Sequence, residues 1–303
     1  MNRTMKILIA YDGSDCSKEA LNDLKRAGLP RETEALVVSV CDVALPPPDA
    51  APFADLLKVP QARLIAYEME ARLAEERAQA LRAVEEAHEL AEEAVRQLKS
   101  DFPLWDVRAE SMAGTPASAV IKEADDWNAD LIVVGTHGRT ALGRLILGSV
   151  SQKVAAEAHC SVRVARCPVE KSGSPIRLVI GVDGGAGARA AVRAVTQREW
   201  PASSEARVIV ADNYLKPSGA GSTGAAEEQT ASANELVEMA KEDLRAVAGL
   251  HVSSEIIEGD PKSILIGEAK KFDADCIFIG SGNSDSAAVL SGAHCTVEVV
   301  RAR

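Results

Sequence analysis

The sequence contains two copies of one pattern, and this internal repeat restricts the possible folds more than any other feature. Three blocks of the first copy recur in the same order in the second: 6–14 as 177–185, 114–136 as 259–281, and 159–166 as 294–301. The offset between matched blocks shrinks along the chain, so the second copy is shorter. We therefore predict two related domains, 1–168 and 176–303, joined by a linker at 169–175, where Pro, Gly and Ser interrupt the pattern.

Each copy alternates short β-rich runs with helical patterns. In the first copy the β-rich runs lie at about 5–11, 35–41, 104–112, 131–135 and 161–166. Such alternation is typical of βαβ crossovers, which build a mostly parallel sheet with helices on both faces. We expect an α/β fold of two tandem flavodoxin-like or Rossmann-like doubly wound domains, each with a five-stranded, mostly parallel sheet.

The last β-rich run of each copy, SVRVAR in the first and TVEVVR in the second, alternates apolar and polar residues. This pattern indicates a strand at the edge of a sheet or a strand with one wetter face. Two such strands could pair with each other, either within the chain as a pseudo-dimer or between two chains as a homodimer.

Charge and composition narrow the range of partners. A formal net charge of −11 disfavours binding to a nucleic acid. The apolar runs are too short for a signal segment or a membrane span, so we expect a cytoplasmic protein with no membrane partner. The six cysteines contain no CxxC pair. A metal site shared by His159-Cys160 and His294-Cys295 is conceivable, but duplication alone accounts for both pairs.

A glycine-rich segment, GTHGRTALGRLILGS at 135–149, follows the fourth β-rich run and precedes a helical pattern. In an open parallel sheet, ligands bind at the carboxyl ends of the strands, which is where this segment lies. Gly135, Gly138 and Gly148 would let the backbone turn tightly and approach a ligand, and Ser149 is predicted to cap the following helix. Amides at such a helix N-terminus form an anion site, which favours phosphate.

Side chains of the same segment also suit an anion. Thr136 and Thr140 offer hydroxyl donors where a phosphate chain would lie, and Arg139 and Arg144 could add positive charge at the rim. A glycine-rich loop taken alone is equally consistent with a flexible connection.

Two neighbours favour the nucleotide interpretation. Asp12 ends the first strand at the same edge of the sheet and could accept hydrogen bonds from ribose hydroxyls. Val40 lies near the end of the second strand, where backbone groups could meet an adenine edge.

These residues carry a resemblance to a known family. The spacing Gly135-x2-Gly138-x9-Gly148-Ser149 is similar to the Gly-x2-Gly-x9-Gly-Ser/Thr signature of ATP-binding universal stress proteins. The blocks KILIAYDGSDCSKEAL, GTPASAVIKEA and HCSVRVAR resemble the other blocks of that family, and together they span nearly all of 5–166. The second half resembles the family less closely, so the chain resembles a tandem universal stress protein.

The resemblance implies ATP in the first domain, with a divalent ion such as Mg²⁺ bridging the phosphates. It implies that Asp12 faces the ribose and adenine, and that Val40 contacts adenine through its backbone. The phosphate contacts would be Gly135, Gly138, Gly148 and Ser149. Further contacts at neighbouring family positions would be Ala10, His137, Val150 and Ser151, beside Thr136.

The second copy departs from this pattern. Asp183 matches Asp12, but only two residues separate Gly280 from Asn283, where twelve separate Gly135 from Gly148. We predict that the second domain does not bind ATP in the family manner and is a structural or regulatory partner. Its crevice could still hold adenosine or another small ligand.

The segment 62–100 has a strong helix pattern of on the order of 55 Å, longer than a sheet of this class needs. We expect one helix packed on the sheet with a solvated outer face. Alternatively, its overhanging end contacts the second domain or another subunit.

We predict an ATP-binding protein with a regulatory role in stress response. The sequence has no Walker-type lysine after the glycines and no assignable nucleophile and base, so we assign no catalytic residue. Weak ATP hydrolysis stays possible. Two alternatives are a slow ATPase or nucleotide-dependent transferase, and a structural, chaperone-like assembly module.

Overall fold

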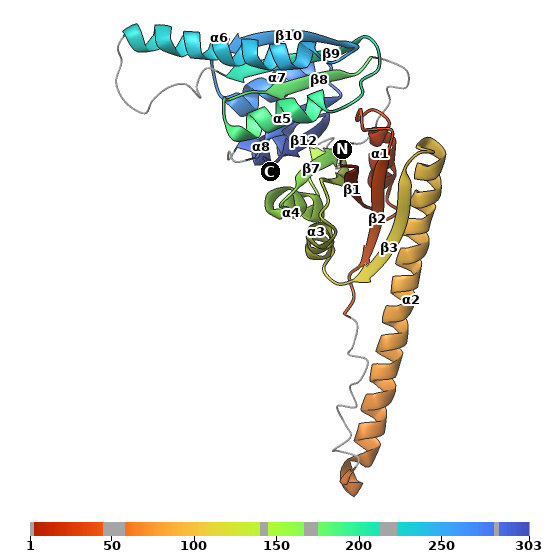
Figure 1. Cartoon of the computed structure of the whole chain (residues 1–303). Coiled ribbons are helices and arrows are strands. Elements are labelled where there is room, and N and C mark those ends of the chain that lie inside the picture. Colours follow the sequence, from red (N-terminus) through yellow and green to blue (C-terminus); the bar gives the residue numbers. More distant parts are fainter. Residues whose placement is uncertain are drawn as a thin grey trace.

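The computed structural model describes residues 3–44, 58–139, 145–166, 175–211, 223–281 and 285–302 (Figure 1). The elements of the first repeat are β1 (Met5–Ala10), α1 (Asp15–Leu24), β2 (Thr33–Cys41), the 3-10 turn η2 (Pro60–Ala62), α2 (Arg63–Asp101), β3 (Asp106–Ala113), α3 (Pro116–Trp127), β4 (Leu131–Gly135), β5 (His137–Arg139), β6 (Leu145–Ile146), α4 (Ser149–Glu157) and β7 (Ser161–Ala165). Those of the second repeat are β8 (Arg177–Gly181), α5 (Ala186–Thr196), β9 (Ser204–Ala211), α6 (Thr223–Arg245), β10 (Leu250–Ile257), α7 (Pro261–Lys271), β11 (Cys276–Gly280), α8 (Asp285–Gly292) and β12 (Thr296–Val300). Most of the predicted linker lies outside the described residues.

Ten of the described strands form a single sheet in the order β10-β9-β8-β11-β12-β7-β4-β1-β2-β3. Within each repeat the strands are parallel, and their order is 3-2-1-4-5 when numbered along the sheet-forming strands of that repeat. This is the Rossmann strand order 3-2-1-4-5-6 without its sixth strand, rather than the flavodoxin order. The prediction of two doubly wound α/β domains is confirmed.

The two repeats meet where β7 pairs antiparallel with β12, with Arg163 directly opposite Glu298. β7 also pairs with β4, and β12 also pairs with β11, so both strands are interior to the sheet. Of the two pairings left open by the sequence, the structure adopts the one within the chain. The ends of the two domains are thereby joined about a pseudo-twofold axis.

One apolar core runs through both domains on one face of the sheet. It joins residues under α3 and α4, such as Val120 and Val154, to residues under α7 and α8, such as Leu265 and Val289. The opposite face has two separate cores, one beneath α1 and α2 and one beneath α5 and α6. Alternate residues of β7 and β12, including Val162, contribute to the shared core because side chains alternate across a strand.

The polar residues of β7 and β12 point to the other face and are not wet, contrary to the sequence interpretation. Arg163 and Glu298 are each 1% exposed. The Arg163 guanidinium pairs with Asp23 at the end of α1 at 2.6 Å and with Glu298 at 3.1 Å, and Glu298 also pairs with Arg198. The alternation therefore marks a buried ion network at the domain junction.

A second set of arginines ties each domain to the other's helices. Arg301, just after β12, donates to the carbonyl oxygens of Ala155 at the end of α4 (2.8 Å) and Cys160 (3.0 Å). Arg166, at the matching position after β7, donates to the carbonyl of Leu290 near the end of α8. Positive charge is favourable at a helix C-terminus, so these contacts stabilise the junction reciprocally.

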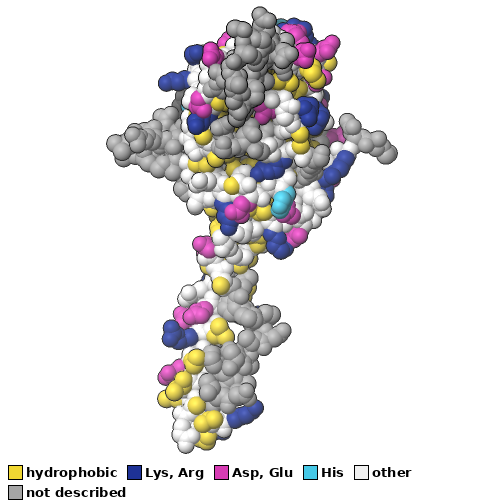
Figure 2. All heavy atoms as spheres, turned by 90° about the vertical axis from the view of Figure 1, so that its left-hand side faces the viewer, with side chains coloured by type: hydrophobic (Ala, Val, Ile, Leu, Met, Phe, Trp, Pro, Cys, Tyr) yellow, Lys and Arg dark blue, Asp and Glu magenta, His cyan; other side chains and the backbone are white. Residues whose placement is uncertain are grey.

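The predicted long helix is a single element, α2, of 39 residues. Its C-terminal half packs on β2 and β3 through small and aliphatic side chains such as Ala91 and Leu98. Its N-terminal half extends past the sheet as an arm directed away from the second domain (Figure 1). Hydrophobic side chains lie on the surface of this arm (Figure 2). The alternative of a contact with the second domain is therefore wrong.

Candidate functional site

A cavity of about 260 Å³ lies at the carboxyl ends of β1 and β4. The strand order reverses there, because β2 and β4 flank β1 on opposite sides, and this is the usual ligand position in open α/β sheets. The cavity is lined by Ala10, Tyr11, Asp12, Ser14, Cys16, Ser17, Val38, Val40, Pro116, Val120, Val134, Gly135, Thr136, Val150 and Ser151.

The structure brings most of the predicted site residues together. Those that line this cavity are Ala10, Asp12, Val40, Gly135, Thr136, Val150 and Ser151. Gly148 and Ser149 are next to Val150 at the start of α4, and His137 and Gly138 lie on β5. Their roles toward a nucleotide stay predictions.

Asp12 follows β1 and forms a tight turn into α1. Its Oδ1 accepts hydrogen bonds from the Ser14 amide at 3.0 Å and the Ser14 hydroxyl at 2.6 Å. The turn needs glycine at position 13, where φ is 75° and a Cβ would come within 2.8 Å of Leu90. Burial raises the pKa of Asp12, but hydrogen bonds from Ser14 and Ser17 outweigh this effect and hold the pKa below its ordinary value. Asp12 is therefore an anionic acceptor at the cavity.

One wall of the cavity is apolar. Val38 and Val40 share a face of β2, Val134 is the second-last residue of β4, and Pro116 and Val120 come from the first turns of α3. Alternate strand residues and helix residues four apart point the same way, which is why these side chains converge. A flat apolar group such as a purine base fits such a wall.

The structure gives Gly135 a role that the sequence did not reveal. A Cβ at this position would lie 2.5 Å from the carbonyl oxygen of Cys16, so the end of β4 passes directly against the first turn of α1. The Ser151 hydroxyl donates to the Gly135 carbonyl at 2.5 Å and fixes α4 to the same strand end. These two residues hold the floor of the cavity together.

The start of α4 differs by one residue from the prediction. Gly148, not Ser149, is the N-cap residue, and no side chain caps the helix. The first-turn amides of Ser149, Val150 and Ser151 have no carbonyl one turn earlier in the helix to bond. An uncapped helix N-terminus beside a cavity is suited to an anion.

Thr136 supplies a second polar group. It is 1% exposed and lines the cavity. Among the described residues its Oγ1 has no hydrogen-bond partner. Buried hydroxyls without a partner are rare and usually indicate a bound group or water.

Between β4 and α4 the chain forms a small hairpin of β5 and β6, which the sequence did not predict. Its strands reach α1 on one side and α8 of the second domain on the other. The backbone of His137 and Gly138 lies on this hairpin, as does that of Arg139. Thr140 and Arg144 lie outside the described residues.

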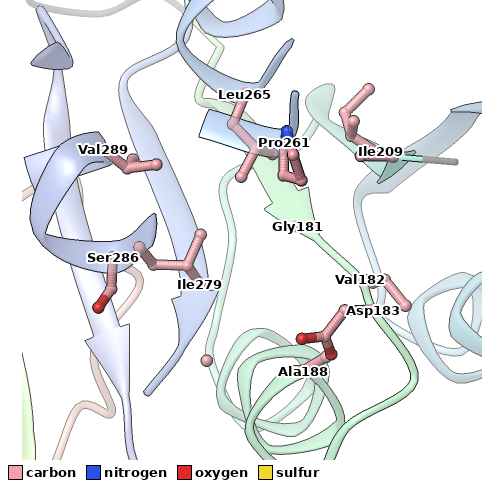
Figure 3. Close-up of a pocket in the computed structure, with 12 residues that line it drawn as sticks. Gly181, Val182, Asp183, Ala188, Ile209, Pro261, Leu265, Ile279, Ser286 and Val289 are labelled. Carbon is pink, nitrogen blue, oxygen red and sulfur yellow. The ribbon is translucent and has the colours of Figure 1, made fainter. Parts of the chain in front are cut away.

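The second domain has a smaller counterpart at the carboxyl ends of β8 and β11. The cavity there is about 40 Å³. Asp183 lies on its α5 side, and Leu265, Ile279 and Val289 lie on the side of α7 and α8 (Figure 3). Asp183 accepts a hydrogen bond from the Gly185 amide at 2.8 Å, which reproduces the turn at Asp12.

The second cavity is smaller because the chain segment beside it is shorter. Thirteen residues, 136–148, connect β4 to α4, whereas four residues, 281–284, connect β11 to α8. The matched strand end is also closer to its helix: a Cβ on Gly280 would lie 2.3 Å from the backbone of Gly187. Asn283 and Ser284, which the repeat alignment sets against Gly148 and Ser149, lie outside the described residues.

The residues with defined positions contain no group of three or more His, Cys, Asp or Glu side chains that could hold a metal ion. His159 pairs instead with Asp125 at 2.9 Å. None of the helices in the described ranges is long and apolar enough to cross a membrane.

Sequence reasoning missed several lining residues. Tyr11, Val38 and Val134 could have been found from the register of the parallel strands, since they neighbour predicted residues at the same strand ends. The others required knowing how α1 and α3 cover this end of the sheet, because Ser14, Cys16 and Ser17 lie at the start of α1, and Pro116 and Val120 lie in α3.

Fold and cavity together define a tandem doubly wound α/β protein with an open crevice in its first domain, where the strand order reverses. The universal stress protein family matches residues 4–166 and 177–301, and the chain belongs to that family. A universal stress protein of Methanocaldococcus jannaschii is 34% identical over 169 residues, covering 55% of this chain and 85% of that protein. One from Thermus aquaticus is 38% identical over 160 residues, covering 53% of this chain and 97% of that protein.

The tandem arrangement also has a structural counterpart. A crystal structure of a universal stress protein from Archaeoglobus fulgidus superimposes with a TM-score of 0.62 at 19% identity. It covers 98% of this chain and 98% of its own. At that identity the likeness supports the two-domain fold and nothing finer.

Proposed function

We propose that this universal stress protein binds ATP in its first domain and acts as a nucleotide-responsive regulatory protein in the cytoplasm. The observation that carries the proposal is the buried hydroxyl of Thr136, which has no hydrogen-bond partner within the described part of the chain, beside the uncapped N-terminus of α4. A polar group of this kind, at a cavity with one apolar wall, calls for a ligand with acceptor oxygens.

The remaining groups suit the other parts of the nucleotide. The base would lie on the wall formed by Val38, Val40 and Val120, and the ribose hydroxyls would donate to Asp12. The phosphates would accept hydrogen bonds from Thr136 and the α4 amides. Mg²⁺, when bound, would neutralise phosphate charge that the helix terminus meets only in part. The cavity, about 260 Å³ in its described part, approaches the roughly 300 Å³ at which ligand pockets begin.

The second domain would not hold a nucleotide. Its cavity of about 40 Å³ has room for only a few water molecules. It also lacks a long connection between β11 and α8 that could surround phosphates. We infer one nucleotide per chain, with the second domain as a structural partner.

Binding rather than turnover is the better-supported role. The closest hydroxyl to Asp12 belongs to Ser14, which also accepts from the Ser17 amide at 3.3 Å and so serves as the cap of α1. A serine held in a helix cap is not an activated nucleophile. Slow hydrolysis would then be incidental to binding.

The test begins with protein purified without added nucleotide. After denaturation, chromatography of the released material should show up to about one adenine nucleotide per chain, and calorimetry on stripped protein should show Mg-ATP binding. Thr136→Val should weaken ATP about ten- to a hundredfold, because it removes one hydrogen bond to a charged group. Ser281→Ala, at the matched position of the second domain, is the control and should leave affinity unchanged.

The ligand series identifies the groups in use. Affinity should rise from adenosine to AMP to ADP to ATP if the α4 terminus binds phosphate. No released nucleotide together with no heat on adding Mg-ATP would refute the proposal. An ATP affinity that falls with Ser281→Ala but not with Thr136→Val would place the site in the second domain and refute its assignment to the first.

A further inference from the structure

The outer face of the α2 arm carries an apolar stripe that the nucleotide site does not use. Its members alternate in spacing between three and four residues and are all exposed: Leu64, Tyr67, Ala71, Ala74, Ala78 and Leu81. We call this set the arm stripe. Leu64, Tyr67 and Leu81 are 71%, 60% and 52% exposed. A three-four repeat of apolar residues is the pattern of helices that pair along their length.

The protein's own domain does not cover the arm stripe. The buried residues of α2, such as Ala80, Ala87 and Ala94, lie on the side that faces the sheet. At 100° per residue the arm stripe lies on nearly the opposite side of the helix. No described residue therefore covers it, and all six of its side chains are exposed (Figure 2 shows apolar side chains at the end of the arm).

The stripe also stops where the arm meets the domain. The next positions in the same three-four series are Glu85, His88 and Glu92, which are polar, and His88 pairs with Glu92 at 4.0 Å. The apolar repeat thus coincides with the part of α2 that overhangs the sheet. A helix surface whose only role is to be solvated has no reason to change from apolar to polar residues where α2 reaches the sheet.

We propose that two copies of this chain associate by antiparallel pairing of their arms along the arm stripe. In this register Leu64 lies beside Leu81 of the second copy, Tyr67 opposite Ala78, and Ala71 opposite Ala74. The central alanines let the helices approach closely, and the large Tyr67 ring meets the smallest neighbour available. Each contact occurs twice because of the twofold axis between the arms.

A parallel pairing is excluded by charge. It would align the two α2 helices along their full length and bring Glu85 against Glu85 and Glu92 against Glu92 of the second copy. Like charges at facing positions are destabilising. The antiparallel register confines the contact to the overhanging arms, with the two bodies at opposite ends.

The area that two paired arm stripes would bury is that of a reversible dimer. The stripe spans 18 residues, roughly 27 Å, and two such helices bury on the order of 1,000 Å² in total. That area lies at the weak end of specific interfaces. The fifth strands, β7 and β12, are already paired with each other, so they do not compete as the association surface.

Sedimentation velocity of the full chain from about 1 to 300 µM tests the association. The unmodified protein should shift from monomer to dimer across this range. Ala74→Arg should abolish the shift, because it places a charge at the centre of the stripe. Gln79→Arg adds the same charge to an exposed position of the arm outside the stripe and should leave the shift intact. A monomer at all concentrations, or a dimer unaffected by Ala74→Arg, overturns the proposal.

Disulfide formation tests the orientation. Under mild oxidant, Leu64→Cys mixed with Leu81→Cys should give a cross-linked dimer, whereas either variant alone, and the unmodified protein, should not. In an antiparallel pair two residues at position 64 lie about 25 Å apart. Cross-linking of Leu64→Cys with itself would establish a parallel arrangement and overturn the antiparallel one.

Discussion

Replacing Glu298 by Gln should lower the free energy of unfolding by about 3–5 kcal/mol. Glu298 and Arg163 are each 1% exposed and face each other across β12 and β7. Glu298 balances two guanidinium groups, those of Arg163 and Arg198, while Asp23 balances Arg163 from the other side. The four charges sum to zero. Gln keeps the size of Glu, but its NH2 group donates and cannot accept from a guanidinium, so the change removes the charge and one of the two acceptors.

The magnitude follows from the site that the charge leaves behind. After the substitution the cluster carries one uncompensated positive charge out of contact with water. Breaking a buried pair by removing one partner costs several times more than breaking a surface pair. Against a total stability of about 5–15 kcal/mol this is a large fraction.

Urea unfolding followed by tryptophan fluorescence measures the effect, since Trp105 and Trp127 lie in the first domain and Trp200 lies in the core of the second, against Gly28 of the first. The variant should unfold at lower urea, and the two domains should lose their common transition. Arg163→Met with Glu298→Met provides the matched cycle: the double variant should lose less than the sum of the single losses by about 1–3 kcal/mol. A loss under about 0.5 kcal/mol for Glu298→Gln would refute the reasoning.

Three further outcomes are expected. Asp12→Asn should destabilise the protein at pH 7. The pKa of Asp12 is lower in the folded state than its unfolded value of about 3.9, so the stabilisation from the carboxylate is fully present above that pH and is lost as pH falls through the folded-state pKa. Equal melting temperatures of variant and parent at pH 7 would contradict this expectation. Arg301→Met should cost about 1–2 kcal/mol in thermal unfolding and speed amide exchange at the end of α4, whereas unchanged exchange there would mean that the arginine does not cap the helix. Ser149→Asp should raise the melting temperature of the nucleotide-free protein slightly and weaken ATP at least about tenfold, because the carboxylate occupies the helix terminus that phosphate needs; undiminished ATP affinity would remove α4 from the site.

The sequence predicted the fold well because the repeat and the alternation of strands and helices are local patterns. The runs at β4 and β11 are apolar throughout, as strands covered on both faces must be. The ion network was missed because Asp23, Arg163 and Arg198 are far apart in the chain, and only the crossing of α1, α5 and β7 brings them together. The alternation of apolar and polar residues in β7 is the same as that of a strand with one solvent-exposed face.

The candidate site was predictable to a similar extent. Residues that end strands, such as Asp12 and Gly135, follow from the rule that ligands lie at carboxyl ends. The hairpin of β5 and β6 was not predictable, since Gly138 and its neighbours read equally well as an irregular loop. The close contact of Gly135 with Cys16 was also hidden, because it depends on how α1 is set against β4.

Matched positions of the two repeats favour the pairing of the two domains with each other. Arg163 and Glu298 occupy equivalent places in the repeat and meet on the pseudo-twofold axis, with Val162 facing Val299 and Val164 facing Val297 on either side. A pair of first domains would bring Arg163 against Arg163 at that point, and a pair of second domains would bring Glu298 against Glu298. Both arrangements set like charges directly opposite each other, although each Arg163 would keep Asp23 and each Glu298 would keep Arg198 as a counter-charge. The opposite charges of Arg163 and Glu298 therefore favour the pairing of one domain with the other over the pairing of like domains.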